Sequence, residues 1–225
     1  MMLTTLVAAI ALQAVNPLVN EYFPLNEGDT YEYEDKIGKG TFAMTIKIGA
    51  PTKGLNGQDL MPEIIETGTG EPQTLLYWPD GDAVKIYMQV AKQNKKNGSL
   101  EYDEDGKPVM TNEVVAYPVF KVTNKEVEWA YRGRTALQDG TASYDLNASA
   151  KYVGFREVLG KKRETILVKM RGTAGAQDGL PIINVTEAYY AKGIGLYQSH
   201  EVQQLGKRKA ERVRRLVAYT PKAGN

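Results

Sequence analysis

The stretch ASYDLNASAKY, residues 142–152, decides the fold class of this chain. One set of alternate positions carries Ala, Tyr, Leu, Ala, Ala and Tyr, whereas the positions between them carry Ser, Asp, Asn, Ser and Lys. Successive side chains of a β-strand point to opposite faces of the sheet, so this pattern is typical of a strand with one apolar and one wet face. A strand this long indicates a large curved sheet or a barrel, because most strands in globular proteins are shorter.

The same alternation recurs along the chain, at residues 42–48, 84–90, 127–131 and 166–170. No stretch sustains the period of 3.6 residues that indicates a helix. Asn-Gly and Asp-Gly pairs, which favour tight hairpin turns, separate the runs and begin at Asn56, Asp80, Asn97, Asp105, Asp139 and Asp178. The pattern therefore predicts a mainly β fold: one large curved antiparallel sheet, half-barrel or barrel-like, with little helix.

The first 14 residues, MMLTTLVAAIALQA, are apolar and uncharged, and they end in small side chains. A membrane-spanning helix needs about 20 apolar residues, so this run is too short for one. It favours a secretory signal peptide cut after Ala14, although no Lys or Arg precedes it, and the alternative is a buried helix or strand. We expect a signal peptide at 1–14, a single antiparallel β domain at 15–225, and an extracytoplasmic (periplasmic or secreted) protein that is not integral to the membrane.

The composition excludes several kinds of chemistry. The chain has no cysteine, which excludes disulfides, zinc–thiolate sites, iron–sulfur clusters and thiol nucleophiles. His200 is the only histidine, so a metal site with two imidazole ligands is excluded, and its strand neighbours Ser199 and Glu201 point away from it. The formal net charge of +1 gives no reason to expect nucleic acid as a partner. We therefore expect no metal, no cofactor and no catalytic residue, and we predict that the protein is not an enzyme.

Three charged or glycine-rich motifs have ordinary structural explanations. The acidic run at 103–105 lacks the ligand spacing of a calcium loop and predicts a solvated turn. Gly-Ile-Gly at 193–195 lacks the third glycine and the helix of a phosphate loop, so it predicts a bulge or a tight turn. The basic cluster at 207–215 could contact an anionic partner, but the balanced net charge favours a charged hairpin and an edge strand.

Small side chains in the middle of the 142–152 stretch leave room for something to lie across the sheet. A packed helix or loop of the chain itself is one alternative, and an apolar ligand is the other, since the mouths of β-barrels are common ligand sites. If a ligand lies there, the residues expected to line its cavity are Trp129, Tyr131, Tyr144, Ala148, Ala150 and Tyr152.

Two motifs near the ends of the chain carry a resemblance to a known group. The first is YFPL at 22–25 followed by GDTYEY at 28–33, and the second is YYAKGIGLY at 189–197 followed by RLVAY at 215–219. They resemble the opening and closing motifs of secreted bacterial β-rich proteins that include the TapB-like ones, with Tyr31 in place of the usual Trp. The resemblance implies no catalytic residue. It implies a fold similar to the half-barrels of LolA- and LolB-like lipoprotein carriers, which hold acyl chains on a concave apolar face, and this is an analogy of fold alone.

These features favour an extracytoplasmic, non-catalytic protein that binds an apolar ligand or lipid on the concave face of its sheet. One alternative is a structural or assembly module of the bacterial cell envelope, with an envelope protein as partner and no small ligand. The other is a carboxylate-based hydrolase of envelope polymers, which needs two acids that converge in a cleft. Sequence spacing does not reveal such a pair, because it would be assembled across strands.

Overall fold

A computed structural model describes residues 14–68, 70–94, 99–137, 140–175 and 180–222. The predicted signal peptide, apart from Ala14, lies outside the described residues, as do Asn97, Asp139 and Asp178 of the predicted turns. None of the helices in the described part is both long enough and apolar enough to cross a membrane.

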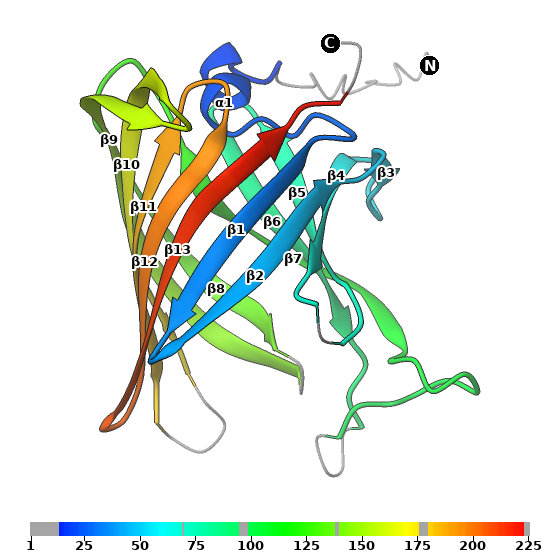
Figure 1. The fold of residues 1–225 in the computed structure, drawn as a ribbon. Helices are drawn as coiled ribbons and strands as arrows, with labels where there is room; N and C mark the ends of the chain where they lie inside the picture. The colour runs from blue at the N-terminus through cyan, green and yellow to red at the C-terminus, as the bar shows by residue number, and fades with distance from the viewer. Residues whose placement is uncertain (1–13, 69, 95–98, 138–139, 176–179, 223–225) are drawn as a thin grey trace, which may run out of the picture.

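The described chain forms one 13-stranded antiparallel sheet, which curls into a barrel with one unsealed seam (Figure 1). Its order is β7-β6-β5-β4-β2-β1-β13-β12-β11-β10-β9-β8, and β3 pairs with β4 beside this path. The predicted mainly β fold with one large curved sheet is confirmed. The strands are β1 (Thr30–Ile37), β2 (Gly40–Ile48), β3 (Thr52–Lys53), β4 (Asp59–Glu66), β5 (Gln73–Asp80), β6 (Ala83–Ala91), β7 (Met110–Lys121), β8 (Val127–Leu137), β9 (Gly140–Val158), β10 (Lys161–Ala174), β11 (Ile182–Ala191), β12 (Gly195–Leu205) and β13 (Arg208–Thr220).

The stretch that decided the fold class lies within β9, the longest strand at 19 residues. Its apolar row is buried at Ala142, Leu146, Ala148 and Ala150, while the polar residues between them are exposed or half-buried. The alternation ends at Tyr152, which is exposed. The strand is thus long enough to form a wall of the barrel from end to end.

The seam of the barrel lies between β7 and β8, which are the two ends of the strand order. Contacts of side chains join the two strands here, instead of a ladder of hydrogen bonds between their backbones. Trp129 on β8 donates a hydrogen bond from Nε1 to the backbone oxygen of Pro118 on β7, at 3.2 Å. The ring of Tyr117 lies 5.3 Å from that of Tyr131 and 4.9 Å from that of Tyr144. Pro118 has no N–H to offer a further strand, which suits the edge of a sheet.

A short helix, α1 (Pro17–Tyr22), lies at one end of the barrel (Figure 1). Asn16 caps it, since its Oδ1 accepts a hydrogen bond from the Leu18 backbone N–H at 3.0 Å, and Pro17 occupies the first helical turn, where its missing N–H costs nothing. This helix was not predicted, because six residues are too few to show a helical period in the sequence.

Two of the three short motifs form turns. The carboxylate of Asp103 accepts hydrogen bonds from the backbone N–H groups of Asp105 and Lys107, so the acidic run is a turn, as predicted. Gly193 and Gly195 have φ of 73° and 91° in the tight turn between β11 and β12, also as predicted.

The basic cluster lies in the hairpin of β12 and β13, but the predicted edge strand is wrong. β13 pairs with β12 on one side and with β1 on the other. Its second neighbour comes from the far end of the sequence, which local pattern does not reveal.

Candidate ligand-binding cavity

The two terminal motifs meet at the end of the barrel that carries α1, and together they fix a plug. The backbone N–H of Gly193 donates to the backbone oxygen of Glu21 at 2.7 Å. The side chain of Lys192 forms an ion pair with that of Glu21, with Nζ 3.0 Å from Oε2. A Cβ added to Gly195 would lie 3.2 Å from Pro24 Cδ, so the closing motif passes close beneath the opening one.

Phe23 fills the barrel axis directly after α1. Its ring centroid lies 5.3 Å from that of Tyr77, 5.4 Å from that of Phe120 and 5.6 Å from that of Tyr190, on strands from both halves of the sheet. Aromatic pairs at such distances add to the stability gained by burial alone. Phe23 and its neighbours therefore close the lumen at this end.

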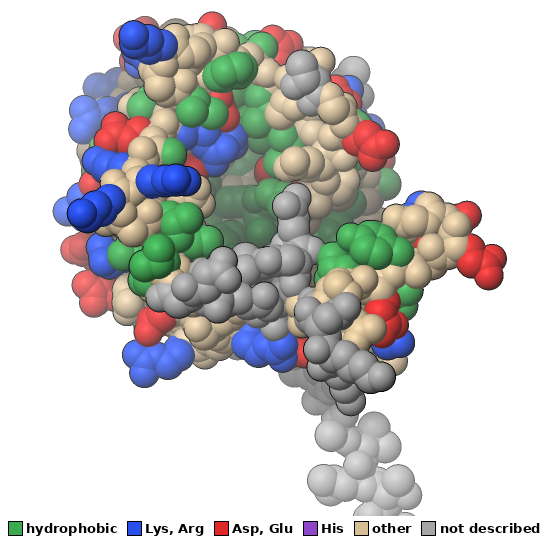
Figure 2. Space-filling model, turned by 90° about the horizontal axis from the view of Figure 1, so that it is seen from below, with side chains coloured by type: hydrophobic (Ala, Val, Ile, Leu, Met, Phe, Trp, Pro, Cys, Tyr) green, Lys and Arg blue, Asp and Glu red, His purple; other side chains and the backbone are tan. Residues whose placement is uncertain are grey.

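A cavity of about 740 Å³ occupies the lumen beyond the plug. Phe23, Pro24 and Leu25 form its floor, and Ile37 and Gln203 line it near the opposite end of the barrel. Figure 2, viewed from that end, shows the molecule hollowed there, with hydrophobic side chains inside the hollow. The volume falls in the range of roughly 300–1,000 Å³ that is typical of small-molecule sites.

Much of the cavity wall is apolar. The inward positions of β2, β4, β5, β6, β7 and β10 carry branched aliphatic side chains and one methionine, because alternate residues of each strand face the lumen. These residues are Ile46, Ile48, Ile65, Leu75, Ile86, Val119 and Met170.

A network of charged side chains lies on the wall formed by β1, β12 and β13. Arg214 donates from Nε and Nη2 to the two carboxylate oxygens of Asp35, at 2.8 and 2.9 Å, and both residues are buried. Arg212 donates to Glu201 from Nη2 at 2.5 Å, and its Nη1 lies 3.8 Å from Asp35. Burial lowers the pKa of Arg214, but the hydrogen bonds to Asp35 together with the negative charges of Asp35 and Glu201 outweigh this effect and leave the pKa above its ordinary value. Two guanidinium groups and two carboxylates thus satisfy each other within the wall.

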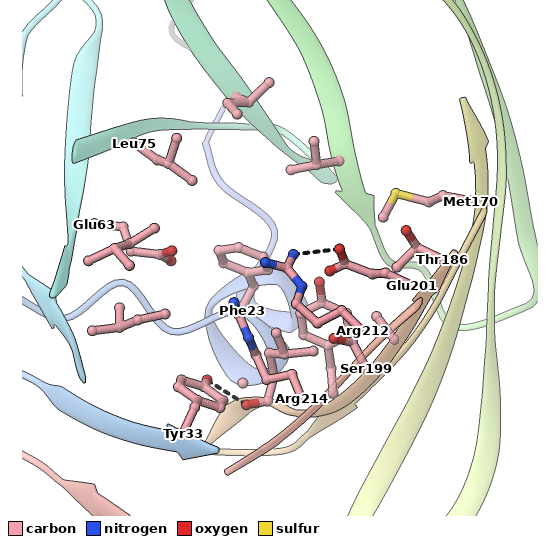
Figure 3. A pocket seen from close by; sticks show the side chains of 18 of the residues that line it. Phe23, Tyr33, Glu63, Leu75, Met170, Thr186, Ser199, Glu201, Arg212 and Arg214 are labelled. Carbon is pink, nitrogen blue, oxygen red and sulfur yellow. Dashed lines mark hydrogen bonds and ion pairs between the residues drawn. The ribbon is translucent and has the colours of Figure 1, made fainter. Parts of the chain in front are cut away.

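Glu63 on β4 carries a carboxyl group that points into the cavity (Figure 3). It makes no hydrogen bond or ion pair with any of the described residues, whereas Arg212 and Arg214 reach into the same space from β13. Desolvation raises the pKa of Glu63 to about 7, although the positive charge of Arg214 opposes the shift. A carboxyl group without an internal partner in an otherwise apolar wall is a candidate contact for a polar group of a ligand.

Ser199 on β12 adds a second unpartnered polar group. It lines the cavity and is 2% exposed, and its Oγ has no hydrogen-bond partner within the described ranges. Buried polar groups are usually hydrogen-bonded, so this hydroxyl is another candidate contact. The described part of the chain contains no group of three acidic or histidine side chains placed to hold a metal ion.

The structure separates the residues that the sequence analysis expected to line a ligand site. Tyr144 lines the large cavity. Trp129 and Tyr131 contribute to the seam, where the hydroxyl of Tyr131 donates to the backbone oxygen of Arg134 at 3.0 Å.

The remaining three residues lie near α1. Ala148 and Ala150 belong to the same buried cluster as Val19 of that helix, and Ala150 lies beside Leu18 and Tyr22 of α1. Ala150 and Tyr152 line a second, smaller hollow of about 370 Å³ beside α1. Whether any of these residues binds a ligand stays a prediction.

The sequence analysis missed the charged groups of the lumen. The sequence does contain an indication of these groups. A charged residue on the same strand face as buried apolar residues is unusual, and so marks a candidate inward-facing charge. Arg214 shares a face with Leu216 on β13, and Asp35 shares one with Tyr31 and Tyr33 on β1. Glu63 similarly shares a face with Ile65. The residues of β4 do not alternate clearly between buried and exposed positions, so its sequence does not show that Glu63 faces the lumen.

No protein-family model matches the chain, and no curated protein matches it in sequence. Among solved structures, a putative lipoprotein from Parabacteroides distasonis ATCC 8503 has 11% identity and a TM-score of 0.47, over 89% of this chain and 99% of its own. A putative exported protein with a YmcC-like fold from Bacteroides fragilis NCTC 9343 has 9% identity and a TM-score of 0.42, over 89% and 99%.

The hypothetical lipoprotein YmcC of Escherichia coli K12 has 9% identity and a TM-score of 0.32, over 90% of this chain and 94% of its own. At these identities and TM-scores the likenesses establish no function for this chain. The resemblance to TapB-like proteins and the extracytoplasmic location stay predictions.

Proposed function

We propose that this chain is an extracytoplasmic, non-catalytic protein that holds one elongated apolar or amphiphilic ligand in the lumen of its barrel. The single observation that carries this proposal is the cavity of about 740 Å³, which is closed at one end by the plug and open at the other. The apolar start of the sequence supports the extracytoplasmic location.

The chemistry of the walls favours a ligand with a long apolar part. Burial of apolar surface gains about 25 cal/mol per Å², and the aliphatic wall offers such surface along most of the lumen. Protein interiors are normally close-packed, so an apolar lumen that holds only water is unfavourable. A bound apolar ligand would supply the missing packing contacts. The plug makes the lumen a pocket with one entrance, which suits retention of a ligand.

The direct test is native mass spectrometry of protein purified from envelope extracts, combined with extraction into organic solvent. We expect one bound amphiphile per chain, released by the solvent. A fluorescent naphthylamine probe should also bind to the delipidated protein, and long-chain amphiphiles should displace it. Protein that carries no extractable ligand and binds no probe would contradict the proposal.

A variant that fills the lumen tests whether binding occurs there. Thr186 on β11 lines the cavity and points into it (Figure 3), whereas its neighbour Val185 is exposed on the outer face of the same strand. We expect Thr186→Phe to weaken probe binding about tenfold or more, and Val185→Phe to leave it unchanged. Equal effects of the two variants would place the probe outside the lumen.

A carboxylate hydrolase is the second candidate, and one observation favours it. Glu63 and Glu201 line the same open cavity, and an acid whose pKa is raised to about 7 suits a general acid. Arg212 already engages Glu201, however, and much of the cavity wall is aliphatic, which suits an apolar chain better than a sugar. Turnover of an envelope polymer that is lost in both Glu63→Gln and Glu201→Gln would favour the hydrolase over the binding protein.

A further inference from the structure

We propose that the lumen selects amphiphiles with a cationic head group, such as an ammonium, and that Glu63 is the residue that pairs with this head group. This inference rests on the proposed function, because it assumes that the lumen holds a ligand with an apolar tail. It adds the chemical class of the ligand and the residue that recognises it.

The balance of charge inside the barrel points to a cation. Three acids on the inward-facing positions, Asp35, Glu63 and Glu201, stand against two guanidinium groups, Arg212 and Arg214. A fourth acid of the cavity lining, Glu211, pairs with Lys209. The acid left over is Glu63, which has no hydrogen bond or ion pair to the described residues. A half-buried carboxylate with no internal partner is favoured when a positive charge of a ligand compensates it.

The two arginines are poorly placed to serve an anionic ligand instead. Arg214 uses Nε and Nη2 on Asp35, and Nη2 also lies 3.4 Å from Met44 Sδ. Arg212 is bound to Glu201. An anionic head group would compete with these carboxylates for the guanidinium groups, whereas a cation meets no such competition.

Aromatic rings surround the same part of the lumen. Tyr33, Tyr77 and Tyr190 line the cavity, and the charge of Glu63 raises the pKa of each, after the larger effect of burial. The faces of such rings attract an ammonium or a quaternary ammonium, and the face of Tyr33 already holds the Arg214 guanidinium at 5.5 Å. A carboxylate among several tyrosine rings therefore offers both interactions that commonly bind a cationic head group, and the aliphatic wall is left for the tail.

Three probes with the same dodecyl chain separate charge from apolar binding: dodecyltrimethylammonium, dodecanol and dodecanoate. Each is titrated, below its micelle concentration, into delipidated protein that carries the naphthylamine probe. We expect the cation to bind about tenfold more tightly than dodecanol at pH 8, and dodecanoate to bind more weakly than dodecanol.

The variant Glu63→Gln should abolish the preference for the cation over dodecanol. Retained binding of dodecanol and of the naphthylamine probe shows that the lumen of the variant is intact. Glu66→Gln is the matched control, because Glu66 lies on the same strand but pairs with Lys47 on the surface. The control should keep the preference for the cation.

The pH dependence gives an independent measurement, because a quaternary ammonium does not titrate. Deprotonation of Glu63 should make the cation bind more tightly as the pH rises through about 7. The groups that face Glu63 are Arg214 on β13, Tyr31 and Tyr33 on β1, Tyr77 on β5 and Tyr190 on β11. The pKa of each is raised above its already high ordinary value, so none of them titrates in this range.

The outcomes separate this inference from the proposed function. Equal binding of the cation and dodecanol, or tighter binding of dodecanoate, overturns the cationic class but leaves lumen binding in place. Absence of binding by all three probes overturns both. A cation preference that survives in Glu63→Gln overturns the role of Glu63.

Discussion

Asp35 and Arg214 are directly opposite each other across β1 and β13, and both are buried in the barrel wall. Two hydrogen bonds of 2.8 and 2.9 Å join their side chains, although 179 residues separate them in the sequence. The strands they join are the first and the last of the chain. The pair therefore holds together the point at which the two ends of the sequence complete the sheet.

Removal of Asp35 should destabilise the protein strongly. Asp35→Ala leaves the Arg214 guanidinium without its hydrogen-bonded carboxylate, with only the more distant Glu201 and Glu63 to oppose its charge. Loss of one partner of a buried pair costs about 3–5 kcal/mol. Urea unfolding should show this loss, and Asp35→Leu combined with Arg214→Met should recover most of it. The exposed pair Lys53–Asp59 is the control, since Asp59→Ala should cost less than about 1 kcal/mol. Similar losses at both sites would contradict the structural role of the buried pair.

The hydrogen bond from Trp129 to Pro118 should stabilise the seam. Trp129→Phe keeps an aromatic ring but removes the donor, so we expect a loss of about 1 kcal/mol and faster amide exchange in β7 and β8. Trp78→Phe is the control, because the described structure shows Trp78 in contact with the Lys85 ammonium and not at the seam. Unchanged exchange in β7 and β8 of the Trp129 variant would show that the seam holds without this bond.

The close approach of Gly195 to Pro24 should make the plug sensitive to a single methyl group. Gly195→Ala places a Cβ 3.2 Å from Pro24 Cδ at a φ of 91°. Gly154 is a matched control, because its φ is 85° and nothing lies within 4 Å of an added Cβ. Backbone strain of about 1–3 kcal/mol is common to both variants, so a larger loss of stability in Gly195→Ala measures the contact with the plug. Equal melting temperatures of the two variants would show that the plug adjusts to the added methyl group at no cost in stability.

The turn between β9 and β10 should be stabilised by a change at Leu159. Leu159 has a φ of 49° and Gly160 a φ of 73°, so this two-residue turn has the conformation that Asn-Gly pairs prefer. We expect Leu159→Asn to raise the free energy of unfolding by about 1 kcal/mol, because asparagine adopts positive φ more readily than leucine. Leu205→Asn, at another exposed leucine on a strand end, should give no such gain in a thermal melt. A lower melting temperature for Leu159→Asn would refute this account.

The raised pKa of Glu63 should make stability depend on pH. The folded state binds a proton at Glu63 more tightly than the unfolded state, so its contribution to stability is complete below about pH 4.5 and is lost as the pH rises through about 7. Each unit of pKa difference corresponds to about 1.4 kcal/mol, reduced here because water reaches the cavity. Glu63→Gln should therefore flatten the decline in unfolding free energy between pH 5 and pH 8. An unchanged decline in the variant would assign it to other groups.

The sequence by itself determined the class of the fold and most of its elements. The alternation within residues 142–152 was sufficient for a long two-faced strand, since the period of two is a local property of extended backbone. The Asp80-Gly81 pair marked the hairpin of β5 and β6 for the same local reason. The absence of cysteine and the single histidine excluded whole classes of chemistry without any structure.

Only the tertiary structure decided what lies against the sheet. The six-residue helix α1 packs into the buried cluster that includes Ala148 and Ala150 of β9, and nothing in its length or period separates it from a loop in the sequence. Asp35 and Arg214 come together from the two ends of the chain, and Glu63 faces them from a third strand. The position of a charged group relative to such distant neighbours depends on how the sheet curls and closes, and this is a long-range property that no local pattern records.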